Sequence, residues 1–369
     1  MTGPGTRPLW FAGGGTGGHL YPGLAIARAV VRHNSAFAPR FIGARRGIER
    51  DVLPTTEFPH SLLDLHPLYR RSPWNNWRTI VGAVGAWRAL SRLAATARPE
   101  AVIGTGGYAA GVALAWARAH GVPTVLHEPD SHPGVTTRAF AGGARAIYLG
   151  FDEALRYLSP PPTADVQTLG APIAPPPTAR VARTQAKAAW GFPENAFVIL
   201  VVGGSQGARA LNDVVAAWCE HGLPPDVAII WATGRTQATA YQDNESSMVR
   251  VRAYLDPIAD AYAAADLAIT RAGAMSIAEL CAWEIPSLLV PLPTAAQDHQ
   301  AHNATALAAS GAAIHVPQGQ LNVGKLESIV NDLRAHPNRL DAMRHAARAR
   351  ARPSAADDIA EAVQALLSA

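Results

Sequence analysis

Gly13-Gly14-Gly15-Thr16-Gly17-Gly18-His19 is the stretch of sequence that decides the fold. It follows the apolar run Leu9–Ala12 and precedes Tyr21–His33, an alanine-rich stretch that predicts a helix. A strand, a glycine turn and a helix in this order open a doubly wound α/β domain. Because glycines let the backbone approach an anion and a helix N-terminus offers free N–H groups, the turn is also a candidate anion site. A tight turn that binds no ligand is the alternative.

The same plan starts again in the second half of the chain. Phe197–Val202 predicts a strand, Gly203–Gly207 a glycine turn and Ala208–Trp218 a helix. Two anion-binding turns fit a ligand held between two domains, whereas a dinucleotide enzyme needs only one. Further short apolar runs predict strands at Arg40–Ile42, Ala101–Ile103, Thr124–Leu126, Ala228–Trp231, Val249–Ala253, Leu267–Ile269 and Ser287–Val290.

Length and proline content divide the chain. Its 369 residues fit two domains at about 150 residues each. Ser159–Pro162 and Pro172–Thr178 contain seven prolines, which cannot continue a helix or a central strand, so we expect a stiff interdomain linker. We expect one domain over residues 1–170 and a second over residues 171–353, with the helix in residues 354–369 packing back on the first.

Composition limits the classes of function. Hydrophobic residues make up 49% of the chain and charged residues 16%, which excludes a disordered protein. The formal net charge is +4 and the basic residues are scattered, so no nucleic-acid partner is predicted. Cys219 and Cys281 cannot form a disulfide framework and indicate reduced thiols of a cytoplasmic protein. Met1–Pro8 lacks a signal-peptide core, and glycines interrupt the uncharged run Ala101–Ala117, so no spanning helix is expected.

Polar residues of the first half stand where strands end, which is where ligands bind in such folds. His19 opens a helix, and the ordinary histidine pKa near 6.5 suits a general base. His127-Glu128-Pro129-Asp130 ends another strand, and its acids could bind a ligand or cap the next helix. Gly104-Thr105-Gly106-Gly107-Tyr108 is either a floor for a bulky ligand or a set of packing glycines.

In the second half, Glu279 could accept hydrogen bonds from ribose hydroxyls, and Asp298-His299-Gln300 could bind sugar hydroxyls. His299 and His302 have the spacing of metal ligands, yet sugar binding explains the group without a metal.

A nicotinamide enzyme is an alternative for the first turn. Gly13, Gly15 and Gly18 satisfy G-x-G-x-x-G, and the turn lacks the Lys-Ser/Thr of a phosphate-loop NTPase. A dinucleotide site expects an acid near the end of the second strand, where this chain has Gly43-Ala44-Arg45-Arg46. The two arginines would suit a 2′-phosphate, so an NADP-dependent oxidoreductase stays open.

Six segments, in this order and spacing, resemble the MurG family of N-acetylglucosaminyltransferases, which makes lipid II in peptidoglycan synthesis. They are GGGTGGHLYPGLAIA from Gly13, FIGARRGIE from Phe41, GTGGYAAG from Gly104, VVGGSQGARALND from Val201, DAYAAADLAITRAGAMSIAEL from Asp260 and QDHQAHNA from Gln297. The resemblance implies the GT-B fold, with two Rossmann-like doubly wound domains facing across a cleft. It also implies inverting transfer of GlcNAc from UDP-GlcNAc to the MurNAc 4-hydroxyl of undecaprenyl-pyrophosphoryl-MurNAc-pentapeptide.

The resemblance further implies roles for individual residues, with no cofactor and no metal. His19 would be the catalytic base. In the second domain the donor would contact Ser205, Gln206, Tyr254, Leu255, Ala274, Met275, Glu279, His299 and Gln300. In the first domain the acceptor would contact Gly15, Thr16, Gly17, Gly18, Gly107, Tyr108, Glu128 and Asp130. A related UDP-sugar transferase that acts on another glycolipid or a natural product is the alternative within this class.

Two positions depart from the family pattern. Asp130 stands where the family has Asn, and Ala174 stands where it has Arg. Both departures concern the acceptor, so we expect either a somewhat altered acceptor or an arginine such as Arg138 or Arg180 in place of the missing one.

A candidate membrane anchor follows residue 68. Tyr69–Arg78 leads into a predicted helix that carries Trp77, Ile80, Val81, Val84 and Trp87, with Trp74 before it and Arg70, Arg71, Arg78 and Arg88 around it. Tryptophan with arginine fits an interfacial anchor for anionic lipid, at the cytoplasmic face of the membrane. A buried helix with solvated arginines is the alternative.

Overall fold

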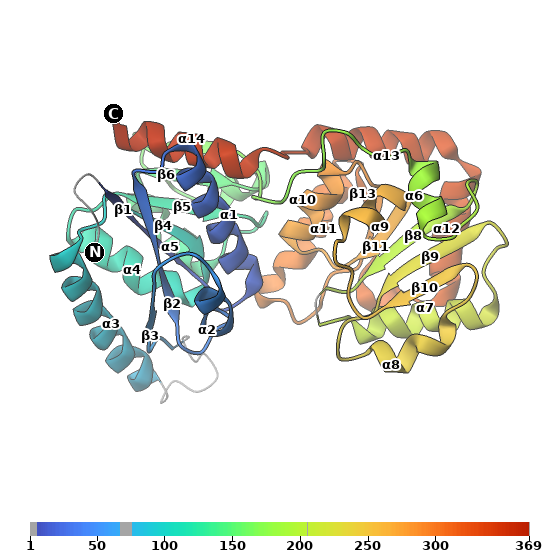
Figure 1. The fold of residues 1–369 in the computed structure, drawn as a ribbon, viewed down its shortest axis with the longest axis horizontal. Helices are drawn as coiled ribbons and strands as arrows, with labels where there is room; N and C mark the ends of the chain where they lie inside the picture. Colours follow the sequence, from blue (N-terminus) through green and yellow to red (C-terminus); the bar gives the residue numbers. More distant parts are fainter. Residues whose placement is uncertain (1–5, 67–75, 205, 369) are drawn as a thin grey trace. The chain divides into compact units, whose positions relative to one another are not determined.

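The computed structural model describes residues 6–66, 76–204 and 206–368. The chain forms two compact units. Unit 1 comprises Met1–Ile173 with Ser354–Ala369, and unit 2 comprises Ala174–Pro353. Figure 1 shows a sheet flanked by helices in each unit.

Unit 1 is built on a seven-stranded sheet in the order β3-β2-β1-β4-β5-β6-β7, in which every pairing is parallel. Its strands are β1 (Arg7–Gly13), β2 (Phe37–Ala44), β3 (His60–Leu63), β4 (Ala101–Gly106), β5 (Thr124–Glu128), β6 (Ala146–Leu149) and β7 (Asp165–Thr168). Its α-helices are α1 (Gly17–His33), α2 (Glu49–Val52), α3 (Asn76–Thr96), α4 (Gly107–Ala119), α5 (Val135–Phe140) and α14 (Ala355–Ser368). The strand order reverses between β1 and β4, and such switch points are where doubly wound folds bind ligands.

Unit 2 repeats the design with six parallel strands in the order β10-β9-β8-β11-β12-β13. Its strands are β8 (Phe197–Val202), β9 (Val227–Ala232), β10 (Val249–Arg252), β11 (Leu267–Thr270), β12 (Ser287–Leu289) and β13 (Ala313–His315). Its α-helices are α6 (Arg183–Ala189), α7 (Arg209–His221), α8 (Ala238–Tyr241), α9 (Ala259–Ala264), α10 (Ala274–Ala282), α11 (His299–Ala309), α12 (Val323–Ala335) and α13 (Pro337–Arg350). Here the order reverses between β8 and β11.

Each central strand is buried on both faces, as parallel sheets require. In β1, Trp10 packs on Trp116 on one side of the sheet, with ring centroids 5.0 Å apart. Its neighbour Phe11 stacks on Phe41 on the other side. This alternation explains why the strands read as short uninterrupted apolar runs.

The C-terminal helix α14 lies along α1 in unit 1 (Figure 1). Ile359, Ala360 and Val363 are buried in the core between them. The Arg7 guanidinium donates to the Leu367 carbonyl oxygen at 2.9 Å, which fixes the end of the helix.

The two α/β units with parallel sheets confirm the predicted fold class, and the predicted strands all form. Four strands were not predicted, namely β3, β6, β7 and β13. The linker interpretation was wrong for Ser159–Pro162, because this stretch lies inside unit 1 and leads into β7, which pairs with β6. Proline is tolerated there because residues 159–162 lie in the loop and turn before β7, outside any helix or strand.

We expect Ile359→Ala to lower the free energy of unfolding by about 2–5 kcal/mol, because it leaves a cavity between α14 and α1. Urea denaturation measures the change. Glu361→Ala, on the exposed face of the same helix, is the control and should cost no more than about 0.5 kcal/mol. Equal losses for the two variants would contradict this packing.

Candidate functional site

In unit 1 the first glycine turn packs directly against the turn between β4 and α4. The Gly14 N–H donates to the Gly106 carbonyl oxygen at 3.4 Å, and Thr105 Oγ1 donates to the His19 carbonyl oxygen at 2.7 Å. A Cβ on Gly107 would lie 2.0 Å from the Gly14 carbonyl oxygen. Backbone packing therefore requires some of these glycines, which was the alternative interpretation of Gly104–Tyr108.

His19 lies half-buried in the first turn of α1, beside both turns. A Cβ on Gly106 would be 2.7 Å from its Nδ1, so the imidazole covers the β4–α4 turn. First-turn N–H groups of a helix lack intrahelical acceptors, and Gly17 and Gly18 supply two of them. The residues Gly17–Leu20 include no acid, so nothing in this turn opposes the positive end of the helix dipole.

Tyr108 lies on the other side of the glycine turn. A Cβ on Gly15 would be 2.9 Å from the Tyr108 ring, so the ring closes over the turn. Thr16 is exposed at the N-cap of α1 and makes no side-chain cap. The structure thus brings together the residues of the two turns that were predicted to bind the acceptor.

Glu128 is buried and is held by its own loop. Its carboxylate accepts bonds from Thr137 Oγ1 at 2.6 Å, from the Gly134 N–H at 3.0 Å and from the Asp130 N–H at 3.1 Å. Burial, and next the Asp130 carboxylate, raise the pKa of Glu128. The bonds of Glu128 to Gly134 and Thr137, at the start of α5, agree with the alternative in which the acid caps the next helix. Asp130 is half-buried and is the more accessible of the two acids.

His127 is fully buried beside this loop, with Nε2 3.2 Å from the Gly170 carbonyl oxygen. Burial lowers the pKa of His127 to about 4. The imidazole is therefore uncharged at neutral pH, and His127 supplies no cation to the neighbouring turns.

In unit 2 a pocket of about 190 Å³ opens at the carboxyl ends of β8, β9 and β11. Its walls are mostly apolar, and its polar groups come from a few positions. The lining residues are Leu200, Val202, Gly204, Ala232, Ala253, Tyr254, Leu255, Ile258, Tyr262, Ala268, Thr270, Ser276, Glu279 and Leu280. Three residues predicted to bind the donor, Tyr254, Leu255 and Glu279, thus lie around one cavity beside the second glycine turn.

Glu279 is the acidic group of this pocket. Its Oε2 accepts a bond from the Tyr262 hydroxyl at 2.8 Å, which leaves Oε1 available to a ligand. Burial raises the pKa of Glu279. Tyr254 is 47% exposed, and the Arg235 guanidinium lies 4.7 Å from its ring centroid. An aromatic ring and a carboxylate in one apolar cavity suit a base and a ribose.

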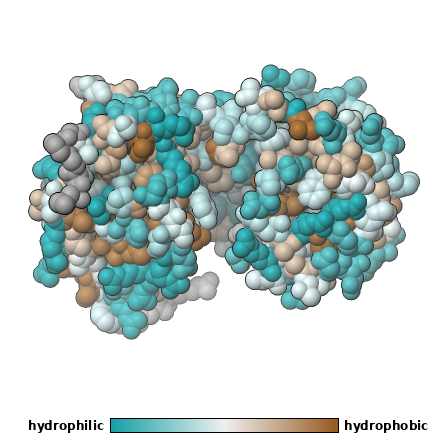
Figure 2. Space-filling model, viewed as in Figure 1, coloured by the Kyte–Doolittle hydropathy of each residue, from teal (hydrophilic) through white to brown (hydrophobic). Residues whose placement is uncertain are grey.

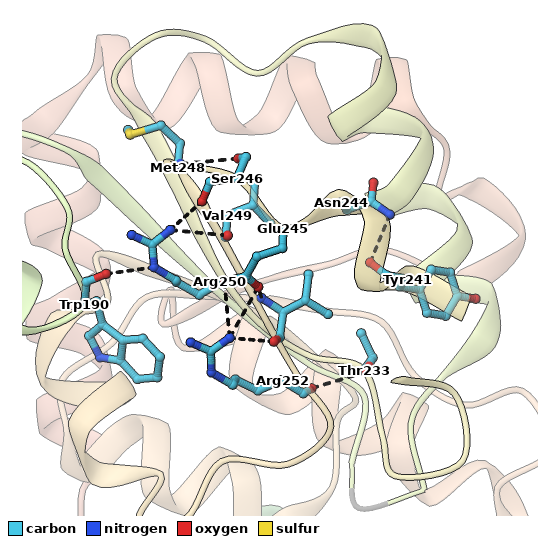
Figure 3. A network of polar contacts seen from close by, with 11 residues as sticks. Trp190, Thr233, Tyr241, Asn244, Glu245, Ser246, Met248, Val249, Arg250 and Arg252 are labelled. Carbon is cyan, nitrogen blue, oxygen red and sulfur yellow. Dashed lines mark hydrogen bonds and ion pairs between the residues drawn. The ribbon is translucent and has the colours of Figure 1, made fainter. Parts of the chain in front are cut away.

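The strand that leads to Tyr254 is held by a polar network (Figure 3). Glu245 accepts bonds from the Val251 N–H and from Arg252 Nη1, and Arg250 Nε donates to the Trp190 carbonyl oxygen. Thr233 Oγ1 donates to the Arg252 carbonyl oxygen. These bonds fix the edge strand β10 two residues before Tyr254.

A second network holds the glycine turn of unit 2. Buried Asn212 accepts from Trp231 Nε1 and donates to the Thr233 carbonyl oxygen and to Gln237 Oε1. Gln237 Nε2 in turn donates to the Gln206 carbonyl oxygen at 3.3 Å. The predicted contact Ser205 lies outside the described residues. The turn is thus connected by hydrogen bonds to buried side chains of α7 and β9.

The N-terminus of α10 carries the predicted contacts Ala274 and Met275. Asn303 Nδ2 donates to the Ala272 carbonyl oxygen, which fixes the approach to the helix. Arg271 points inward, where Nη1 donates to the Val290 and Pro291 carbonyl oxygens. Its charge is used inside the protein, so the backbone amides of α10 are what this turn offers an anion.

The predicted sugar-binding residues stand at the start of α11. Asp298 (φ 53°) and the preceding Gln297 (φ 55°) are left-handed, a conformation that concentrates at functional sites. His299 Nδ1 lies 2.8 Å from the Ala296 carbonyl oxygen, which leaves Nε2 for a ligand. Gln300 Oε1 accepts from the Leu292 N–H, which leaves its amide nitrogen. The part of the chain that the structure describes contains no cluster of three or more metal-ligating acids, histidines or cysteines.

Sequence reasoning missed the residues that support the site, which are Glu49, Asn212, Gln237 and Arg271. The signal was present for three of them, since Glu49, Asn212 and Arg271 lie in segments that resemble the family. Gln237 carries no such signal, because its role depends on the approach of Gly234 to Gly207, where a Cβ would be 2.4 Å from the Gly207 nitrogen.

Two parallel α/β units, each with a glycine turn at its switch point, form the GT-B fold, and the family models that match both units are those of glycosyltransferases. The calicheamicin glycosyltransferase CalG4 shares this fold alone, with a TM-score of 0.71 and 15% identity over 98% of each chain. The glycosyltransferase family 28 N-terminal domain matches residues 9–149, and the corresponding C-terminal domain matches residues 198–359.

Curated relatives narrow the class to one family. The chain is 36% identical over 370 residues to the UDP-N-acetylglucosamine–N-acetylmuramyl-(pentapeptide) pyrophosphoryl-undecaprenol N-acetylglucosamine transferase of Moorella thermoacetica, covering 95% of this chain and 96% of that protein. It is 33% identical over 366 residues to the protein of the same name from Desulforamulus reducens, covering 96% and 97%. The crystal structure of Acinetobacter baumannii MurG matches with a TM-score of 0.77 and 27% identity, over 97% of this chain and 99% of that chain. The chain belongs to the MurG family of N-acetylglucosaminyltransferases, which confirms the resemblance seen in its motifs.

Proposed function

We propose that the protein transfers GlcNAc, with inversion, from UDP-GlcNAc to the MurNAc 4-hydroxyl of undecaprenyl-pyrophosphoryl-MurNAc-pentapeptide, a step of peptidoglycan synthesis. The observation that carries the proposal is the unit 2 pocket, where Tyr254, Leu255 and Glu279 line one cavity beside Gly204. The names of the curated relatives give the same donor and the same acceptor.

The donor would extend over unit 2 from the pocket to the starts of α10 and α11. Tyr254 and Leu255 would contact the uracil, and Glu279 would accept bonds from the ribose hydroxyls through Oε1. The turn at Gly204–Gln206 and the amides of Ala274 and Met275 would hold the diphosphate. The GlcNAc hydroxyls would reach His299 and Gln300, each of which keeps one polar atom for a ligand.

Stabilisation of the leaving UDP would come from backbone dipoles. The α10 amides and the second glycine turn would face the negative charge that develops on the diphosphate as the glycosidic bond breaks. These groups need no reorganisation during the reaction, because Asn303 fixes the approach to α10 and Gln237 fixes the turn.

The acceptor would bind unit 1, with its diphosphate at the α1 N-terminus and its sugar near His19. His19 would take the proton of the 4-hydroxyl while that oxygen forms its bond to C1 of GlcNAc. Attack on the face opposite UDP inverts the anomeric centre. Asp130 and the turn at Gly107–Tyr108 would border the same sugar.

The direct test is transfer from radiolabelled UDP-GlcNAc to a short-chain analogue of the lipid acceptor, without added metal. We expect one labelled disaccharide lipid and one UDP per turnover. Isothermal titration with UDP-GlcNAc, UDP-GalNAc and NADP should show preference for UDP-GlcNAc. Turnover only with a different glycolipid or natural-product acceptor would support the related transferase, and binding of NADP in place of UDP-GlcNAc would support the oxidoreductase.

His19→Ala should lower kcat by about 10²–10⁴-fold, because the attacking hydroxyl loses its base. UDP-GlcNAc affinity should stay unchanged, since the donor residues belong to unit 2. His33→Ala, at the other end of α1, is the control for effects on the helix. A wild-type kcat in His19→Ala would remove His19 from the role of base.

Donor binding should depend on pH through Glu279. Because burial raises its pKa, Glu279 takes up a proton at a higher pH than an ordinary glutamate and then accepts ribose hydroxyls less well. UDP-GlcNAc affinity should therefore fall as the pH is lowered from neutral. Calorimetry measures this affinity, and the diphosphate diester of UDP-GlcNAc does not itself change charge over this range. Glu279→Gln should bind about tenfold more weakly at neutral pH and lose the pH dependence. Glu327→Gln, on the surface of α12, should behave as wild type. A pH dependence that persists in Glu279→Gln would assign it to another group.

We also propose that the protein binds the membrane surface peripherally through α3, at the cytoplasmic face. Trp77, Ile80, Val81 and Val84 are between 47% and 65% exposed, which is unusual for four large apolar side chains on one helix. Figure 2 shows hydrophobic residues reaching the surface of unit 1 along α3. The Arg78 guanidinium lies 5.4 Å from the Trp77 ring centroid, and Trp87 packs against the core.

These exposures contradict the alternative of a buried helix for the first two turns of α3. The neighbouring Arg70, Arg71 and Trp74 lie outside the described residues. Among the helices that the structure describes, none is long and apolar enough to cross a bilayer. An exposed apolar stripe beside arginine supports interfacial binding to anionic lipid.

Trp77→Ala should weaken binding to vesicles of anionic phospholipid by about tenfold, because the indole no longer enters the interface. Vesicle sedimentation measures binding, and circular dichroism checks that the variant is folded. Leu155→Ala, which removes an exposed apolar side chain away from α3, should bind as wild type. Unchanged binding of Trp77→Ala would contradict the proposed surface.

A further inference from the structure

Glu49 is a fully buried carboxylate that the proposed reaction does not use. It opens α2, and its side chain reaches beneath the first glycine turn. Oε2 accepts the Gly15 N–H at 2.9 Å, and Oε1 accepts the Ala44 N–H at 3.2 Å. One carboxylate therefore joins the turn after β1 to the end of β2.

Two glycines are required by this side chain. A Cβ at Gly14 would lie 1.8 Å from Oε1 of Glu49, and a Cβ at Gly47 would lie 1.9 Å from Oε2. A Cβ at Gly43 would come within 3.0 Å of the Glu49 Cβ. The glycines at 14 and 47 therefore make room for a protein carboxylate, and no external ligand is needed to explain them.

The position of Glu49 determines which amides remain for an anion. In a dinucleotide-binding turn the backbone at the second glycine of the motif, here Gly15, approaches the pyrophosphate. In this protein the Gly15 N–H is taken by a carboxylate, whose charge repels a phosphate at the same place. Gly17 and Gly18 keep first-turn N–H groups, with no acid in that turn of α1.

We propose that Glu49 is a positioning residue of the acceptor site. Its carboxylate occupies the part of the glycine turn next to β1, at Gly14 and Gly15, and fixes the backbone there. The Gly17 and Gly18 amides and His19 are thereby presented to the acceptor diphosphate and sugar, and a nucleotide is rejected at this turn. The identity of the acceptor rests on the proposed function.

Glu49→Gln is the informative change, because it keeps the size of the side chain and alters only its hydrogen bonding. A carboxylate accepts at both oxygens, whereas an amide must turn its NH₂ toward either Gly15 or Ala44, each of which is a donor. The turn must then shift. We expect kcat/KM for the acceptor analogue to fall about 10–100-fold while the KM for UDP-GlcNAc changes less than about twofold.

Glu100→Gln is the matched control. Glu100 is a half-buried carboxylate at the amino end of β4, the opposite end of the same sheet, where it pairs with Arg7 at 2.8 Å. Both variants should have a lower melting temperature, but only Glu49→Gln should separate the acceptor kinetics from the donor kinetics. A merely structural role would lower the active fraction without that separation.

The outcomes distinguish this proposal from the proposed function. An active wild-type enzyme together with wild-type acceptor kinetics in Glu49→Gln would overturn the role of Glu49. No transfer by the wild-type enzyme would instead be a failure of the proposed function. Circular dichroism reports whether the variant is folded, because UDP binding would report on unit 2 alone and Glu49 lies in unit 1. If Glu49→Gln gives no folded protein, Glu49→Asp, which keeps the charge but shortens the side chain, carries the same test.

Discussion

Direct contact between backbone segments, with no side chain between them, is the constraint on which both candidate sites depend. A Cβ on Gly107 would lie 2.0 Å from the Gly14 carbonyl oxygen, and one on Gly207 would lie 2.1 Å from the Thr233 carbonyl oxygen. In each unit this contact joins the turn after the first strand to the turn after a neighbouring strand. The helices that follow are thereby fixed at their N-termini. In the proposed function, the amides at the α1 N-terminus and in the second glycine turn would offer positive charge to the diphosphates of acceptor and donor from rigid backbone.

Buried carboxylates organise these turns from inside the protein. Glu49 and Glu128 each accept two or more hydrogen bonds from backbone N–H groups of the surrounding loops, so each carboxylate stabilises the conformation of its loop. Glu279 differs, because only one of its oxygens is bound and the other faces the pocket. Glutamates therefore have different roles in this protein, and the role depends on how many hydrogen-bond donors of the protein surround each carboxylate. A site that binds anions tolerates these acids because each has its own N–H or O–H partners.

The sequence predicts the central strands well, because parallel strands buried on both faces are short apolar runs followed by glycine. It fails for the edge strands β3, β7 and β13, which are partly exposed and have sequences such as Asp165–Thr168. It also missed β6, although β6 is a buried apolar run followed by Gly150. Among site residues, the resemblance to the family points to Tyr254, Leu255 and Glu279, which line one pocket. Asn212 and Gln237 could not be linked from the sequence, because their bonds connect α7, the turn after β9 and the glycine turn. Such bonds depend on register between elements that are far apart in the chain.

The two departures from the family pattern are unequal in physical terms. Arg180 donates to the Ala282 carbonyl oxygen, and its guanidinium lies 5.5 Å from the Trp283 ring centroid, so its charge is already engaged within unit 2. Arg138 is exposed on α5, next to the Thr137 that holds Glu128. Asp130 adds a negative charge there, but burial and that same charge raise the pKa of Glu128. Glu128 therefore keeps a proton more readily than it would beside an uncharged amide.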